Sequence, residues 1–166
     1  MKKVFSLFLT LVVLSTVIIS ASSSVYATPS SVIQIYRDNI ITYAMGARGA
    51  TYSSTNRFGP LSYDCSGLAY KAYQYAGLAI TSNCAADQAN ALTVSGRLSS
   101  YTSRTKGDLI FYHLESTPNG RYLNIDHVAI CAGSGYVIDA GSPGVSRRVD
   151  TNFSTSSVKA TTVPLY

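Results

Sequence analysis

Apolar residues recur at helical spacing in two segments of the N-terminal half. The first segment, residues 32–45, predicts an amphipathic helix. The second predicted helix covers residues 65–76, with Asp64 as its N-cap and Gly77 as its terminator. Its apolar face consists mostly of small residues, which predicts close packing against a sheet. Residues 47–63 are rich in Gly, Ser, Thr and Asn and are predicted to form a loop.

Short β-rich segments separated by turn residues dominate the second half of the chain. They predict strands over residues 108–112, 128–131, 136–140 and 160–165. Gly133-Ser134-Gly135 would join the middle two strands into a hairpin. The connection over residues 113–126 has the length of a functional loop. Helices followed by strands indicate an α+β fold with an antiparallel sheet.

The N-terminus has the layout of a secretory signal peptide. Two lysines precede an apolar run from Val4 to Ile19, and Val25-Tyr26-Ala27 forms a cleavage site. The run is short for a bilayer and is interrupted by Ser and Thr, so we expect no stable membrane anchor. We expect a signal peptide over residues 1–27 and a single exported domain over residues 28–166.

Composition and charge narrow the class of protein further. Hydrophobic residues make up 46% of the chain and charged residues 13%, which favours a buried core over disorder. The formal net charge of +5 falls to +3 when the two leader lysines are removed. This mild and scattered positive charge gives no indication of nucleic-acid binding.

One of the cysteines, Cys65, is a candidate nucleophile in the second predicted helix. The chain has three, Cys65, Cys84 and Cys131, and an odd number in an exported protein leaves at least one unpaired. Cys65 falls in the predicted first turn, where the helix dipole and free N–H groups favour a thiolate and can stabilise an oxyanion. A buried, inert cysteine is the alternative from position alone. A disulfide between Cys84 and Cys131 also stays open.

A thiol nucleophile needs a base, and the two histidines are His113 and His127. If the hairpin folds about Gly133, residues whose numbers add to 266 face each other, which pairs His127 with Asp139. Asp139 would accept the Nδ1 proton of His127 and leave Nε2 for the thiol. The alternative is a polar pair on an exposed sheet face. His113 is expected on a surface loop.

Four ordered motifs carry a family resemblance: Asp64-Cys65-Ser66-Gly67-Leu68, Gly107-Asp108-Leu109-Ile110-Phe111-Tyr112, His127-Val128-Ala129-Ile130 and Val137-Ile138-Asp139-Ala140. Over residues 32–165 the chain resembles the NlpC family of papain-like cell-wall cysteine peptidases. The resemblance implies a papain-like fold, with N-terminal helices on a central antiparallel sheet, and hydrolysis of peptidoglycan stem peptides, commonly between D-Glu and a diamino acid. It implies that Cys65 is the nucleophile, His127 the base and Asp139 the residue that orients His127.

The resemblance also implies a substrate site and includes two departures. Tyr52, Asp64 and Ser66 would contact the substrate, with Asp64 and Tyr52 reading a free L-Ala amine. The family's third catalytic residue is more often His than the Asp139 found here. Residues 57–65 look like related phage lytic enzymes, some of which are amidases, so the bond that is cut stays open.

Several functions compete with the stem-peptide endopeptidase. They are an N-acetylmuramoyl-L-alanine amidase, a transferase in which an amine captures the thioester, and a wall-binding module that has lost turnover. A zinc enzyme is disfavoured because no spacing resembles a metal-ligand pair, and no cofactor is expected. We expect peptidoglycan or muropeptides as the partner, and a secreted or cell-wall-associated location.

Overall fold

The computed structural model describes residues 29–114, 117–151 and 158–160. Its helices are α1 (Pro29–Gly46), α2 (Cys65–Tyr75), α3 (Ala85–Val94) and two 3-10 turns, η1 (Tyr101–Ser103) and η2 (Tyr122–Asn124). Its strands are β1 (Thr51–Tyr52), β2 (Ser62–Tyr63), β3 (Leu98–Ser100), β4 (Leu109–Tyr112), β5 (His127–Gly133), β6 (Tyr136–Gly141), β7 (Gly144–Val149) and β8 (Val158–Ala160). The predicted signal peptide and all but the first residue of the last predicted strand lie outside the described residues.

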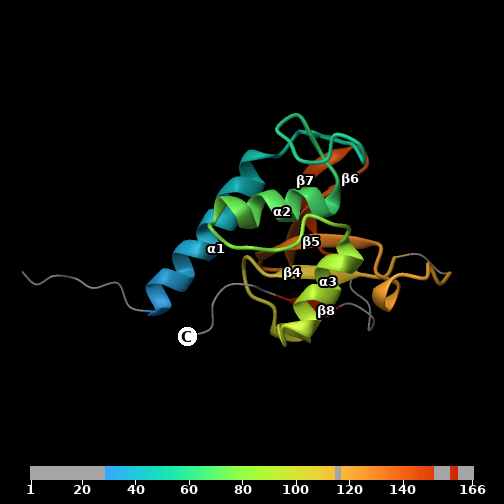
Figure 1. Ribbon diagram of the computed structural model, residues 1–166. Helices are drawn as coiled ribbons and strands as arrows, with labels where there is room; N and C mark the ends of the chain where they lie inside the picture. The colour runs from blue at the N-terminus through green and yellow to red at the C-terminus, as the bar shows by residue number, and fades with distance from the viewer. Residues whose placement is uncertain (1–28, 115–116, 152–157, 161–166) are drawn as a thin grey trace, which may run out of the picture.

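The strands form one sheet in the order β2-β1-β7-β6-β5-β4-β8-β3. Every neighbouring pair is antiparallel except β1 with β2. Helix α2 packs beside α1 and against β5 and β6, while α3 contacts β4 and β5 (Figure 1). The predicted α+β fold, with N-terminal helices on an antiparallel sheet, is confirmed.

Two of the three α-helices in the described part of the chain were predicted. Helix α2 starts at Cys65, and its N-cap Asp64 accepts a hydrogen bond of 2.6 Å from Gly67 N. Gly77 follows the helix with a φ of +78°, a conformation that glycine adopts without steric cost. Helix α3 was not predicted, because its buried face is mostly alanine and therefore gives a weak hydrophobic signal.

Side chains of the central strands alternate between two buried clusters. Leu109 and Phe111 of β4 belong to the larger cluster, which also contains the inner faces of α1 and α2. Ile110 and Tyr112 of the same strand belong to a smaller cluster that includes Tyr101 of η1. Both faces of the strand are covered, which explains why its sequence is an uninterrupted apolar run.

The β5–β6 hairpin differs in register from the prediction. Its turn is Ser134-Gly135, with φ values of 53° and 76° as in a type I′ turn, and a β-bulge lies between Cys131 and Gly133. Ile130 lies opposite Ile138, so paired residues add to 268 and the predicted register was wrong by two. Because the slip is even, every side chain stays on its predicted face.

Strand β7 was also missed by the sequence prediction. Its sequence, GVSRRV, has a buried valine, Val145, but exposes Ser146, Arg147 and Val149, so no clear alternation marks it as a strand. It nevertheless pairs with β6 along its whole length, with Asp139 opposite Ser146. This strand supplies a residue to the candidate site described below.

Candidate active site

Cys65 is the first residue of α2 and is half-buried. The first N–H groups of a helix lack acceptors within the helix, so this position places N–H donors and the positive end of the dipole beside the thiol. All three cysteines are free thiols, so the structure has no bond between Cys84 and Cys131. Cys131 is buried, and burial raises the pKa of its thiol.

His127 starts β5, and Asp139 lies on the same face of β6. In the observed register Asp139 is the diagonal neighbour of His127 and not its direct partner. Diagonal neighbours are about 7–8 Å apart, so the contact is made by the tip of the imidazole ring. His127 Nε2 lies 2.7 Å from Asp139 Oδ2, which leaves Nδ1 for the thiol. The prediction had the two ring nitrogens reversed.

The surroundings of His127 favour its protonated form. Burial lowers the pKa of His127, but hydrogen bonds to Asp139 and Cys65 and the negative charge of both partners raise it to about 9. An imidazole with this pKa is an imidazolium at neutral pH. His127 is thus bonded to the Asp139 carboxylate on one side and interacts with the Cys65 thiol on the other.

Arg148 of β7 is a fourth residue of this site, bonded to Asp139, and it was not predicted from the sequence. Its Nε and Nη2 donate to the two carboxylate oxygens of Asp139 at 3.1 and 2.5 Å. Burial raises the pKa of Asp139, but the hydrogen bonds from His127 and Arg148 more than offset this and hold it below the ordinary value. Asp139 is therefore a carboxylate that bridges two cations.

Tyr52 of β1, which the family resemblance assigns to the substrate site, lies within electrostatic range of the Cys65 thiol. The residue is 45% exposed. Burial raises the pKa of Tyr52, and the negative charges of Cys65 and Asp64 raise it further, which places all three groups within electrostatic range.

Asp64 and Ser66, the other two predicted substrate contacts, already have protein partners. Asp64 Oδ2 lies 2.7 Å from Arg57 Nε, and its other oxygen caps α2. Ser66 is 2% exposed, and its hydroxyl accepts a hydrogen bond from Arg57 Nη2. Both residues flank Cys65 in the chain, and the Arg57 guanidinium contacts the side chains of both.

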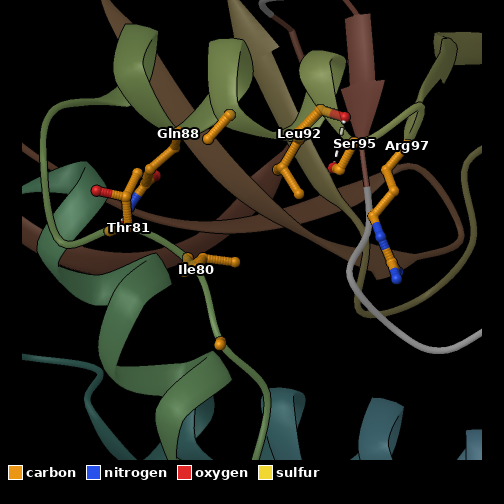
Figure 2. A pocket seen from close by; sticks show the side chains of 8 residues that line it. Ile80, Thr81, Gln88, Leu92, Ser95 and Arg97 are labelled. Carbon is orange, nitrogen blue, oxygen red and sulfur yellow. Dashed lines mark hydrogen bonds between the residues drawn. The ribbon is translucent and has the colours of Figure 1, made fainter.

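A cavity of about 280 Å³ opens beside His127. It is lined by Leu114, His127, Asp139, Gly141, Ser142, Gly144, Ser146 and Arg148. A separate cavity of about 390 Å³ lies between α3 and the segment that precedes it (Figure 2). His113 lies outside the helices and strands, as predicted, and is half-buried, with Nε2 inaccessible and unbonded within the described part of the chain.

The backbone of Arg57 touches the first turn of α2, and this contact predicts the effect of a substitution. A Cβ on Gly67 would lie 1.9 Å from Arg57 O. We expect Gly67→Ala to destabilise the protein by about 1–3 kcal/mol, the usual cost of overpacking, as measured by guanidinium unfolding. Gly46→Ala is the control, since a Cβ there has nothing within 4 Å. Equal unfolding midpoints for the two variants would contradict the close contact.

The α+β fold, with N-terminal helices on an antiparallel sheet, is of the papain-like NlpC type, and comparison with known proteins identifies the family. The model of the NlpC/P60 family matches residues 42–163. The chain belongs to the NlpC/P60 family, whose members are generally cysteine peptidases that act on peptidoglycan.

Individual relatives agree with this assignment. The chain is 33% identical over 104 residues to probable endopeptidase p60 of Listeria grayi, which covers 63% of this chain and 16% of that protein. It matches an NlpC/P60 family protein from Bacillus cereus with a TM-score of 0.63 and 22% identity, over 77% of this chain and 40% of that one. It also matches RipD from Mycobacterium tuberculosis, a non-catalytic NlpC/p60 domain protein, with a TM-score of 0.58 and 21% identity, over 76% and 97% of the two chains.

The described residues contain neither a cluster of metal ligands nor a helix suited to spanning a membrane. They contain no group of three or more His, Cys, Asp or Glu side chains placed to hold a metal ion. Within the same residues no helix combines the length and the apolar character needed to cross a membrane.

Proposed function

We propose that this protein is a secreted thiol hydrolase that cuts a peptide bond in the stem peptide of peptidoglycan. Cys65 acts as nucleophile, His127 as base and acid, and Asp139 as the group that orients His127. The observation that carries the proposal is the position of His127, which is bonded to Asp139 at 2.7 Å and interacts with Cys65, so that its pKa is raised to about 9. Export rests on the signal-peptide pattern of residues 1–27 and agrees with a family that acts on the cell wall.

The arrangement supports a two-step acyl transfer. The Cys65 thiolate attacks the scissile carbonyl carbon, and the resulting oxyanion is stabilised by N–H groups of the first turn of α2. His127 then gives its proton to the leaving amine as the C–N bond breaks, which leaves a thioester on Cys65. Water, deprotonated by His127, attacks the thioester, and the carboxylic acid product leaves as the thiolate and imidazolium are restored.

The bond we propose is the one between D-Glu and the diamino acid of the stem. Support comes from the family and from the p60 relative, which is named a probable endopeptidase. The chain spans only 16% of that relative, so the relative's complete activity does not transfer directly. This bond is an amide within the peptide, and its cleavage would release a fragment that ends in D-Glu.

Amidase activity is a second candidate, favoured by one specific observation. Asp64 carries Arg57 as an ion-pair partner at 2.7 Å and is not a bare carboxylate facing the groove. An enzyme that detaches the stem from the glycan acts where the L-Ala nitrogen is acylated, so it needs no carboxylate to bind an ammonium group.

A wall-binding module without turnover is the third candidate, and RipD shows that this fold occurs in a non-catalytic protein. In the present chain, however, Cys65, His127 and Asp139 are all present and in contact. A binding module has no need to keep a thiol beside an imidazole that is bonded to a carboxylate, so we favour the enzyme.

Digestion of a defined muropeptide tests the proposal. We expect the protein without residues 1–27 to cut a disaccharide-linked stem after D-Glu, and mass spectrometry to detect the diamino-acid fragment. Iodoacetamide should abolish the reaction, while a metal chelator should not. Release of an intact stem beginning with L-Ala would indicate the amidase instead. Tight binding without any product would indicate the binding module.

A further inference from the structure

Arg57 belongs to the loop that connects β1 to β2 in the chain, and its guanidinium contacts residues at the start of α2. Its Nε is 2.7 Å from Asp64 Oδ2, and its Nη2 donates to Ser66 Oγ. The side chains of Arg57 and Asp64 are only 20% and 15% exposed, so this ion pair is shielded more than an ordinary surface pair. The arginine thus engages both residues that flank Cys65 in the chain.

The guanidinium of Arg57 also donates hydrogen bonds to backbone carbonyls of the segment before α3. Arg57 Nη1 donates to Ser82 O at 3.1 Å, and Nη2 lies 3.3 Å from Asn83 O. Gln88 of α3 lies next to Thr81 of this segment (Figure 2), and its Nε2 donates to Thr81 O at 3.1 Å. The same Nε2 donates to Ser66 O in the first turn of α2 at 2.9 Å. Gln88 is fully buried, so the acceptors that hold Arg57 have a fixed position.

A ring contact and a backbone contact also hold Arg57 in place. The guanidinium carbon lies 4.9 Å from the ring centroid of Phe58, and that ring packs edge-on against Tyr70 of α2 at 5.6 Å. The backbone carbonyl of Arg57 lies so close to Gly67 that no side chain fits there. A substrate group would therefore have to break several contacts at once to displace Arg57.

The charge of Arg57 changes what can bind next to Cys65. A free ammonium group is attracted by an unpaired carboxylate, but Asp64 already has a cation at 2.7 Å. A second cation beside this pair would be repelled by the guanidinium at short range, and such like-charge contacts are a common source of specificity. The pKa of Tyr52 reports the same balance, since Asp64 raises it and Arg57 lowers it after burial has raised it most.

We propose that Arg57 is a specificity-determining residue that closes this end of the groove to a free amine. The substrate is then a stem whose L-Ala nitrogen is acylated, as in glycan-linked peptidoglycan, and not a detached stem peptide. The inference rests on the proposed endopeptidase function, and it reverses the expectation that Asp64 and Tyr52 read a free L-Ala amine.

The test compares two peptides that differ only at the N-terminus. Both are L-Ala-γ-D-Glu-diamino acid-D-Ala, one with a free amine and one N-acetylated, and the rate of cleavage after D-Glu is measured for each. We expect kcat/KM to be about tenfold or more higher for the acetylated peptide. Because acetyl supplies no sugar contacts, this ratio reports the charge at the N-terminus alone.

The pH dependence of this ratio separates charge from shape. A free α-amino group has a pKa of about 7.7–8.0, so the ammonium becomes neutral as the pH rises through 8. The preference for the acetylated peptide should therefore shrink between pH 6.5 and 9. Titration of His127 affects both substrates alike and cancels in the ratio. A steric effect would leave the ratio unchanged with pH.

Variants of Arg57 complete the test. Arg57→Gln removes the cation and leaves Asp64 free for an ammonium, so we expect the ratio to move about tenfold toward the free-amine peptide. Arg57→Lys keeps a positive charge and should keep the preference of the parent. If the glutamine variant does not fold, the pH dependence of the parent protein still decides the question.

The outcomes that overturn the inference differ from those that overturn the function. A parent protein that prefers the free amine, or a ratio that neither pH nor Arg57→Gln alters, would refute the role of Arg57. No cleavage after D-Glu in either peptide would refute the endopeptidase itself, and with it the ground for this inference.

Discussion

Replacing Cys65 by alanine is expected to lower the rate of muropeptide cleavage by about 10³-fold or more, because no other group can form the thioester. The fold should persist, since Cys65 is only half-buried and the cap of α2 is provided by Asp64. The measurement is the release of the diamino-acid fragment by mass spectrometry, with circular dichroism to verify folding. Cys65→Ser should also be inactive, because serine supplies no thiolate.

Cys84 offers a matched control for this experiment. It is also a half-buried free thiol, and it lies at the N-cap of α3 without making a side-chain capping bond. Like Cys65 it therefore lies at the start of a helix, but no histidine is bonded to it in the described part of the structure. Cys84→Ser should keep the activity of the parent. Full activity in a correctly folded Cys65→Ala protein would contradict the proposed mechanism.

The sequence was most informative where a local rule determines the structure. Asp64 and Gly77 mark the two ends of α2, because an N-cap and a left-handed terminator depend only on neighbouring residues. The central strand β4 was predictable from its apolar run. Strand β7 was not, since it exposes Ser146 and Arg147 and is held in place by its pairing with β6.

The candidate site shows the same division between local and long-range information. His127 and Asp139 lie on the same face of the sheet in any register that differs from the predicted one by an even number of residues. The observed register differs by two, so this part of the prediction is unaffected. The ring nitrogen that faces Asp139 depends on the register itself, and the bulge before Gly133 could not be foreseen. Arg57 and Arg148 were assigned no role, because each acts through a partner that only the folded chain brings close.

The contact between His127 and Asp139 predicts how a mutation shifts the pH profile. The carboxylate of Asp139 opposes the effect of burial and raises the pKa of His127 toward 9, so activity should fall at alkaline pH as the imidazolium loses its proton. Asp139→Asn keeps an oxygen that accepts from Nε2 but removes the charge. The pKa of His127 should therefore fall, and the alkaline limb should move to lower pH by about one unit or more.

The losses of kcat/KM expected for variants of Asp139 and His127 differ in size. Asp139→Asn should lose about 10- to 100-fold in kcat/KM at neutral pH, because a neutral amide stabilises and orients the His127 imidazolium less well than a carboxylate does. His127→Ala should lose about 10³-fold or more, since it removes both the base and the acid. Asp38 is a surface carboxylate that accepts a hydrogen bond from Lys106. The control variant Asp38→Asn should leave the alkaline limb of the pH profile unchanged. An Asp139→Ala protein with the parent's rate and pH profile would show that another group orients His127, and that the carboxylate bridging His127 and Arg148 serves stability alone.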